Sequence, residues 1–312
     1  MSKRKRFKHQ HGRGSAEGRR RTEPGPARHE TPAQGQVDDP DGGPPPHRQQ
    51  EQHGKSGSAV WIYGTHPVSE IVSNKYRIIR RLVSVSEGQK QLASEFASLI
   101  SMRGQPLVPE TLDRHAFERL LPAGSVHQGI AVLVEPLVPP DLFEICDAAE
   151  SSGSSLLLIL DQVTDPHNVG AILRSAAAFG AQAIIVTERN AATESGVLAK
   201  AASGALEHVP LVPVTNLARA MAQLKEGGFW CIGLGAEGGE TLAEIDLSGR
   251  VALVLGAEGS GLRRLTRDNC DKLARLPTQG PIGQLNVSNA AAIALYEVAR
   301  RRPGLPAGGS GR

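Results

Sequence analysis

Two runs of consecutive apolar residues constrain the fold of this chain more than any other feature. Residues 156–160 read Leu-Leu-Leu-Ile-Leu, and residues 251–255 read Val-Ala-Leu-Val-Leu. A strand that is apolar at every position has to be buried on both faces, as the central strands of parallel α/β sheets are. The two runs therefore predict a domain built around a parallel sheet.

Strand and helix patterns alternate around these runs. We expect strands at 155–160, 183–186, 209–212, 230–234 and 251–255, the last of them being the final strand of the chain, and helices at 142–150, 166–179, 197–202 and 217–226. Asp165 suits a helix N-cap, Pro166 the first helical position and Gly180 the C-terminal stop. The alternation predicts a doubly wound α/β fold with a parallel sheet.

A smaller α/β domain is expected before it, at residues 58–135. Its strands are predicted at 59–63, 78–85, 107–108 and 129–134, and its helices at 64–73, 89–101 and 112–120. Three prolines within residues 136–140 predict a stiff connector, which marks the boundary between the two domains. The larger domain then spans residues 141–302, and residues 303–312 form a flexible tail.

The first 57 residues have a different composition, rich in Arg, Gly, Pro, Gln and His. They carry 12 Lys and Arg against 7 Asp and Glu, whereas the remaining 255 residues carry 23 against 25. Such a segment buries too little apolar surface to order itself. A basic arm attracts nucleic acid or acidic surfaces. A merely solubilising tail is an equal alternative.

The cysteines and the hydropathy pattern exclude several classes of protein. Cys146, Cys231 and Cys270 are odd in number and widely spaced, with no CxxC and no Cys/His metal spacing. This pattern favours a reducing compartment and argues against a metal site. No apolar run is long enough to span a membrane, and the basic N-terminus lacks the apolar region of a secretory signal. We therefore expect a cytoplasmic protein without a membrane partner.

The first motif covers residues 160–175, where a strand end leads into a helix. Ligand crevices of open α/β sheets lie at such strand ends. Asn168 and Arg174 lie outside the apolar stripe of this helix. They are six residues apart, about 1.7 helical turns, so they point in different directions. Arg174 is either a solvated surface charge or a clamp for phosphate.

The second motif, residues 255–262, is a glycine-rich turn that also follows a buried strand. It is not a P-loop, because it lacks Gly-Lys-Ser/Thr. Glu258 lies inside the turn, where its carboxylate would repel a phosphate. A ligand with adenine, ribose and a positive centre, such as S-adenosylmethionine, fits better. The alternative is a tight glycine turn with an incidental acid.

The third motif, residues 276–289, begins as a Gly/Pro-rich loop and ends where an Ala-rich helix starts. Pro277 and Pro281 lack amide donors, so the loop cannot be a regular strand and offers its backbone groups to a ligand. The alanines at 290–292 would let another backbone segment approach closely. In the simpler alternative, Asn286 or Ser288 only caps an ordinary core helix.

In this order and at these spacings, the three motifs resemble those of the SpoU/TrmH family of the SPOUT superfamily. These are S-adenosylmethionine-dependent RNA ribose 2′-O-methyltransferases. The resemblance covers about residues 155–302. Residues 58–135 resemble the ribosomal-protein-like RNA-binding domain of the RlmB-type branch, of which residues 127–130 are typical. The resemblance implies a homodimer and a C-terminal trefoil knot, although threaded chains are rare.

Residue roles follow from the resemblance, position by position. The candidate catalytic residues are Asn168, Arg174, Glu258, Asn286 and Ser288. The candidate cofactor-binding residues are Gly256, Leu276, Leu285, Gly280 and Ile282. The family often has serine where this chain has Gln284, so the role of that serine would pass to Ser288 or Asn289.

The implied reaction is attack of a ribose 2′-hydroxyl on the sulfonium methyl group, which requires in-line placement and loss of a proton. A guanidinium is a poor base because its pKa lies above about 12. Arg174 is therefore expected to bind the neighbouring phosphate and steady the developing alkoxide. Asn168 would orient the ribose, and Glu258 would orient Arg174 or the target nucleoside.

The implied substrate is a guanosine of 23S ribosomal RNA. Two alternatives remain: a transfer-RNA ribose methyltransferase, and a non-catalytic RNA-binding assembly factor that has lost the cofactor. The intact glycine turn favours cofactor binding, and the N-terminal domain favours ribosomal RNA.

Overall fold

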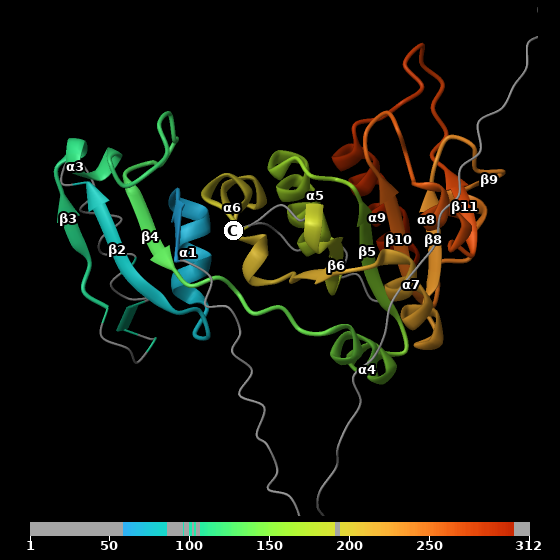
Figure 1. Cartoon of the computed structure of the whole chain (residues 1–312), viewed down its shortest axis with the longest axis horizontal. Coiled ribbons are helices and arrows are strands. Elements are labelled where there is room, and N and C mark those ends of the chain that lie inside the picture. Colours follow the sequence, from blue (N-terminus) through green and yellow to red (C-terminus); the bar gives the residue numbers. More distant parts are fainter. Residues whose placement is uncertain are drawn as a thin grey trace, which may run out of the picture. The chain divides into compact units, whose positions relative to one another are not determined.

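A computed structural model of the chain describes residues 59–85, 96, 100, 101, 103, 107–190 and 194–302 (Figure 1). The predicted basic segment and C-terminal tail lie outside the described residues, and so does most of the helix predicted at 89–101. The described residues form two sheets, one of four strands and one of seven.

The smaller sheet is mixed and has the strand order β1-β4-β2-β3. Its elements are β1 (Val60–Tyr63), α1 (Thr65–Ser73), β2 (Ile79–Val85), β3 (Glu110–Leu112), α3 (Arg114–Glu118) and β4 (Ile130–Val134). The central strand β4 pairs antiparallel with β1 and β2, and β3 adds to β2 in parallel. An α/β fold for this region was predicted correctly.

Two boundaries in this region were predicted wrongly. The strand expected at 107–108 is β3, which begins at Glu110, and the helix expected from Leu112 begins at Arg114. Asp113 sets the helix start, because its side chain accepts a hydrogen bond from Ala116 N over 2.8 Å. Val108 is 79% exposed, so the apolar pair there belongs to a loop.

The larger sheet is parallel in every pairing and has the order β7-β6-β5-β10-β8-β11-β9. The strands are β5 (Ser155–Asp161), β6 (Ala183–Thr187), β7 (Leu211–Val214), β8 (Trp230–Leu234), β9 (Glu240–Thr241), β10 (Arg250–Gly256) and β11 (Lys272–Arg275). All seven residues of β5 are buried. The two apolar runs are therefore neighbouring central strands, as their composition predicts.

Helices cover both faces of this sheet, which confirms the doubly wound arrangement. The helices are α4 (Leu142–Ser152), α5 (Pro166–Ala178), α6 (Gly196–Ala202), α7 (Leu217–Glu226), α8 (Arg264–Asp268) and α9 (Val287–Arg301), with the 3₁₀ helices η1 (Glu188–Asn190), η2 (Ala205–Glu207) and η3 (Leu242–Glu244). Leu156 and Leu158 pack into the core with α5, α6 and α9. Leu157 and Ile159 pack with α4 and α7 on the opposite face.

The last strand was predicted wrongly. β11 follows β10, and only Ala274 of its four residues is buried, so no apolar run marks it in the sequence. The short β9 was not predicted either, because it has no apolar run. The strand expected at 209–212 begins two residues later, at Leu211.

The Ala-rich helix α9 packs against α5 and β10. Ala291 and Ala294 are fully buried, so small side chains do allow the close approach that the sequence indicated. The trefoil knot implied by the resemblance stays a prediction.

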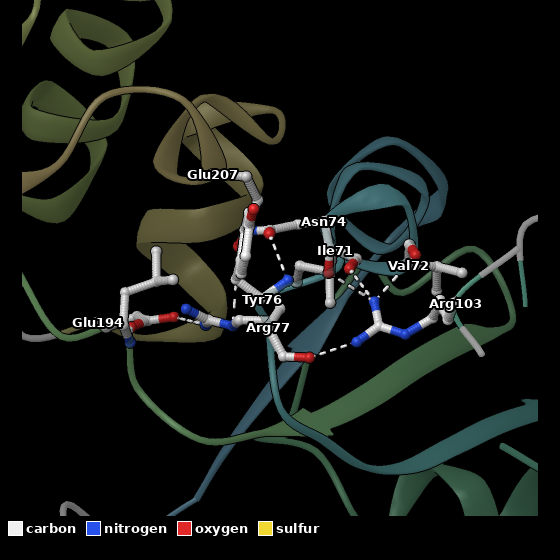
Figure 2. A network of polar contacts seen from close by, with 9 residues as sticks. Ile71, Val72, Asn74, Tyr76, Arg77, Arg103, Glu194 and Glu207 are labelled. Atoms are coloured by element: carbon white, nitrogen blue, oxygen red, sulfur yellow. Dashed lines mark hydrogen bonds and ion pairs between the residues drawn. The ribbon is translucent and has the colours of Figure 1, made fainter. Parts of the chain in front are cut away.

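Small and charged residues form the junction between the two sheets. A side chain at Gly196 of α6 would overlap the ring of Tyr63 in β1. Arg77, which follows α1 and is 2% exposed, forms an ion pair with Glu194 (Figure 2). Glu194 also accepts a hydrogen bond from Leu137 N in the proline-rich connector.

Candidate active site

Three loops meet at the carboxyl edge of the parallel sheet. They follow β5, β10 and β11, which lie in the sheet order β5-β10-β8-β11. Gly256 at the end of β10 lies beside Asp161 at the end of β5. The loops that follow β5 and β10 carry the first two motifs. Ligands of open α/β sheets bind at this edge.

The second motif is a tight turn closed by its own backbone. Gly261 N donates to Ala257 O over 2.9 Å, and Gly259 and Gly261 have positive φ angles of 79° and 65°. A Cβ atom at Gly256 would overlap the backbone of Gly261. Only glycine fits at the first position of the turn, so backbone atoms rather than a side chain form the surface of the turn there.

A buried carboxylate holds the segment after this turn. Asp161 is fully buried and accepts hydrogen bonds from Arg263 N over 2.9 Å and Arg263 Nε over 2.6 Å. The contact connects the ends of the first two motifs. Sequence reasoning missed it, although a charged residue directly after an apolar strand is a usable signal.

The polar residues of the three motifs form one cluster, to which Asn168, Glu258 and Asn286 each contribute a side chain. Asn168 Nδ2 donates to Glu258 Oε1 over 3.1 Å, and Asn286 Nδ2 donates to Asn168 Oδ1 over 3.0 Å and to Glu258 Oε1. Val287 N also donates to Glu258 Oε1, over 3.4 Å. One carboxylate oxygen therefore links residues that are far apart in the sequence.

Asn286 has a second role as the N-cap of α9. Its Oδ1 accepts hydrogen bonds from Ser288 N over 2.9 Å, Asn289 N over 3.4 Å and Ser288 Oγ over 2.5 Å. The capping alternative considered from the sequence is thus correct for Asn286. It coexists with the contact to the cluster, because the capping oxygen and the donating nitrogen are different atoms of one amide.

Arg174 lies apart from this cluster. It is exposed on α5, on a different side of the helix from Asn168, as the six-residue spacing predicts. Within the described part of the chain, its guanidinium makes no hydrogen bond or ion pair. Arg174 therefore contacts neither Glu258 nor Asn286 within one protomer, and its charge is free to bind an external group.

A cavity of about 350 Å³ lies beside the cluster. Four predicted residues line it: Gly256, Glu258, Leu276 and Leu285. Gln284, the departure from the family pattern, lines it as well. Gly280 and Ile282 are exposed in the same loop and are not lining residues.

Another part of the cavity lining was not predicted. It contains Gly235, Glu237 and Arg267, and Arg267 pairs with Glu237 over 3.0 Å. Glu237 follows β8 and Arg267 lies in the short helix α8. No motif in the sequence marks either residue, because their pairing depends on the fold.

The thiols are not nucleophiles of this site. Burial raises the pKa of both Cys231 and Cys270 to about 12, so both thiols are protonated at neutral pH. In the described ranges no group of three or more His, Cys, Asp or Glu side chains could hold a metal ion. No helix there is both long and apolar enough to cross a membrane.

Comparison with known proteins identifies the family. Residues 155–296 match the SpoU rRNA Methylase family, and residues 61–140 match the RNA 2′-O ribose methyltransferase substrate-binding family. The chain is 41% identical over 248 residues to a 23S rRNA (guanosine-2′-O-)-methyltransferase, RlmB, of Pseudomonas aeruginosa, covering 77% of this chain and 96% of that one. This chain belongs to the SpoU family. RlmB of Escherichia coli K12 is 40% identical over 242 residues, 77% and 98% of the two chains.

Solved structures of SpoU proteins have the same fold. The SpoU methyltransferase AviRb from Streptomyces viridochromogenes superposes with a TM-score of 0.65 at 24% identity, over 78% of this chain and 90% of that one. AviRb has also been solved in complex with AdoMet, which is S-adenosylmethionine.

The cavity of this SpoU protein fits that cofactor. Its volume lies in the range of small-molecule pockets, about 300 to 1,000 Å³. Leu234, Leu255 and Leu262 provide an apolar wall for a base, and the backbone at Gly256 can approach a ligand closely. The carboxylates of Glu237 and Glu258 suit a ligand with a positive centre.

Proposed function

We propose that this chain transfers a methyl group from S-adenosylmethionine to the ribose 2′-hydroxyl of a guanosine in 23S ribosomal RNA. The observation that carries the proposal is the meeting of Asn168, Glu258 and Asn286 beside a glycine-walled cavity. The RlmB relatives, which match over nearly their whole length, support the substrate.

Gly256, Leu276 and Leu285 would hold the cofactor through their backbone groups, since all three line the cavity. Gly280 and Ile282 belong to the same loop and would contact the ligand from its open side. The bound cofactor supplies an electrophilic methyl group on a sulfonium. Glu258 Oε1 fixes the two asparagine amides, so Asn168 and Asn286 present one defined hydrogen-bonding edge to the ribose.

Arg174 would bind the phosphate next to the target ribose and stabilise the oxygen as it loses its proton. Ser288 donates to Asn286, so its hydroxyl would position that amide rather than act as a base. Gln284 lines the cavity where the family often has serine, and its amide would hydrogen-bond the RNA.

A homodimer would complete the site, because Arg174 lies away from the cluster of its own protomer. Ile293 and Tyr296 of α9 are 46% and 56% exposed and offer an apolar contact for a second copy. Tyr296 packs edge-on against Phe179, with ring centroids 6.0 Å apart, so α5 and α9 would enter the interface together. Light scattering at increasing protein concentration tests this assembly.

Each predicted domain would have its own role in the reaction. Residues 58–135 would bind RNA, residues 136–140 connect, and residues 141–302 catalyse. The basic segment 1–57 would add salt-dependent RNA affinity. With a ribosomal RNA substrate, the reaction would take place in the cytoplasm.

The test is methyl transfer from labelled S-adenosylmethionine to 23S rRNA and to transfer RNA, followed by primer extension to map the modified nucleotide. We expect a 2′-O-methylated guanosine in 23S rRNA and no label in transfer RNA. Label in transfer RNA alone would establish the sister activity. Absence of cofactor binding by calorimetry would favour the assembly factor. Cofactor binding without transfer to either RNA would contradict the proposed substrate.

A further inference from the structure

The turn between α1 and β2 presents two unpaired side chains to solvent. Tyr76 is 93% exposed, in a chain whose aromatic content is only 4%. Lys75 beside it is exposed as well. In the described portion of the chain, neither the Tyr76 phenol nor the Lys75 ammonium makes a hydrogen bond or ion pair. A tyrosine ring normally gains stability by burying its apolar body, so this placement leaves contact area available.

The guanidinium of one arginine fixes this turn through hydrogen bonds to backbone carbonyls. Arg103 Nη1 donates to the carbonyl oxygens of Ile71 over 3.0 Å, Val72 over 2.9 Å and Asn74 over 2.7 Å, and its Nη2 donates to Arg77 O (Figure 2). These carbonyls belong to the end of α1 and to the turn itself. Four bonds from one rigid planar group fix the backbone on both sides of Lys75 and Tyr76.

Asn74 and Arg77 attach the same turn to Glu207 of η2 and to Glu194, which precedes α6. Asn74 Nδ2 donates to Glu207 Oε2 over 2.6 Å, and Asn74 Oδ1 accepts from Tyr76 N over 3.0 Å. The buried Arg77 pairs with Glu194 and lies 3.8 Å from Glu207 (Figure 2). Removing a cation from water is costly, so a buried ion pair at this position defines one conformation of the turn.

We propose that Lys75 and Tyr76 form a contact for an unpaired nucleotide of the substrate RNA. The Tyr76 ring stacks on the base and the Lys75 ammonium binds the adjacent phosphate. Unpaired bases in RNA loops and bulges are recognised by stacking on aromatic rings, and an ammonium is a phosphate ligand. A rigid turn loses little entropy when it binds. This inference rests on the proposed RNA methyltransferase function.

The test compares RNA affinity and methyl transfer in four variants of the full chain. Tyr76→Ala is expected to raise the Kd for a 23S rRNA fragment by about fivefold or more, since stacking on one base is worth at least about that factor. Tyr76→Phe keeps the ring and the affinity. Lys75→Gln is expected to lower the slope of log K against log salt by about one. Trp230→Ala, at another exposed aromatic, is the matched control and leaves RNA affinity unchanged.

Cofactor affinity and turnover at saturating RNA should match the wild type in all four variants. Wild-type RNA affinity of Tyr76→Ala in an active enzyme would overturn this inference and leave the proposed function standing. Unchanged RNA affinity together with an altered oligomeric state would overturn it too, because the turn would then be a protein contact. Absence of methyl transfer by the wild-type chain would instead count against the proposed function.

Discussion

Asn286 donates through Nδ2 to Oδ1 of Asn168 over 3.0 Å, although 118 residues separate the two side chains. The bond connects the N-cap of α9 with the first turn of α5. Glu258 accepts from both amides and from the first backbone N–H of α9. The loss of one member must therefore disturb the other two.

Replacing Asn286 with alanine removes both its cap and its contact with Asn168. We expect a stability loss of about 1 kcal/mol, typical of an N-cap, and a fall in turnover of about a hundredfold as the cluster loses its geometry. Asn216→Ala is the matched control, because Asn216 caps α7 by accepting from Arg219 N over 3.1 Å. It should cost similar stability in thermal unfolding and leave turnover intact. Equal turnover of both variants would contradict the role of Asn286.

Arg174→Lys keeps the charge but removes the planar fork of donors. We expect turnover to fall by about a hundredfold, as when a transition-state donor is lost, while calorimetry finds unchanged affinity for S-adenosylmethionine. Arg219→Lys, at an exposed arginine on α7, should behave like the wild type in both measurements. A fully active Arg174→Lys enzyme would rule out a specific guanidinium contact.

Glu194→Gln removes one of the two carboxylates that pair with the buried Arg77. Breaking a buried pair costs about 3 kcal/mol or more, because the remaining charge stays desolvated. Glu135→Gln breaks the exposed pair with Arg80 and should cost less than about 1 kcal/mol. Urea unfolding measures both values. Equal costs would mean that the Arg77 pair is solvated.

The two cysteines with pKa about 12 predict a specific pH dependence. In the unfolded chain a thiol has a pKa of about 8.5. Because the folded-state pKa is raised, the protonated thiols contribute fully to the stability of the fold below pH about 8.5. This contribution is lost as the pH rises toward 12. Alkylation of Cys231 and Cys270 at pH 9 should be slow in the folded protein and fast in denaturant, as measured by mass spectrometry. Rapid alkylation of the native chain would contradict the raised pKa values of these two thiols.

The sequence predicts those parts of the fold that local residue patterns determine. The helix at 217–226 has the predicted bounds, and β5 and β10 follow from their apolar runs. β11 was missed, because Lys272 and Arg275 are exposed and the strand depends on pairing with β8 and β9. A strand defined mainly by its neighbours leaves little trace in its own composition.

The same distinction applies to the site. Glycine at 256 and a cap at 286 can be predicted locally, because turn geometry and helix starts favour certain residue types. The Glu237–Arg267 pair and the anchoring of Arg263 by Asp161 could not be predicted, since they join residues from different loops. The sequence spacing also indicated that Arg174 points away from Asn168, and the structure agrees.

We infer that the glycine-walled cavity at the end of β10 binds S-adenosylmethionine. Calorimetric titration of Gly256→Ala with this ligand tests it most directly, because the added methyl group would overlap the backbone of Gly261. Gly249→Ala is the control, since a Cβ there meets no atom within 4 Å. We expect wild-type binding by Gly249→Ala and none by a folded Gly256→Ala protein. Wild-type affinity in Gly256→Ala would contradict it.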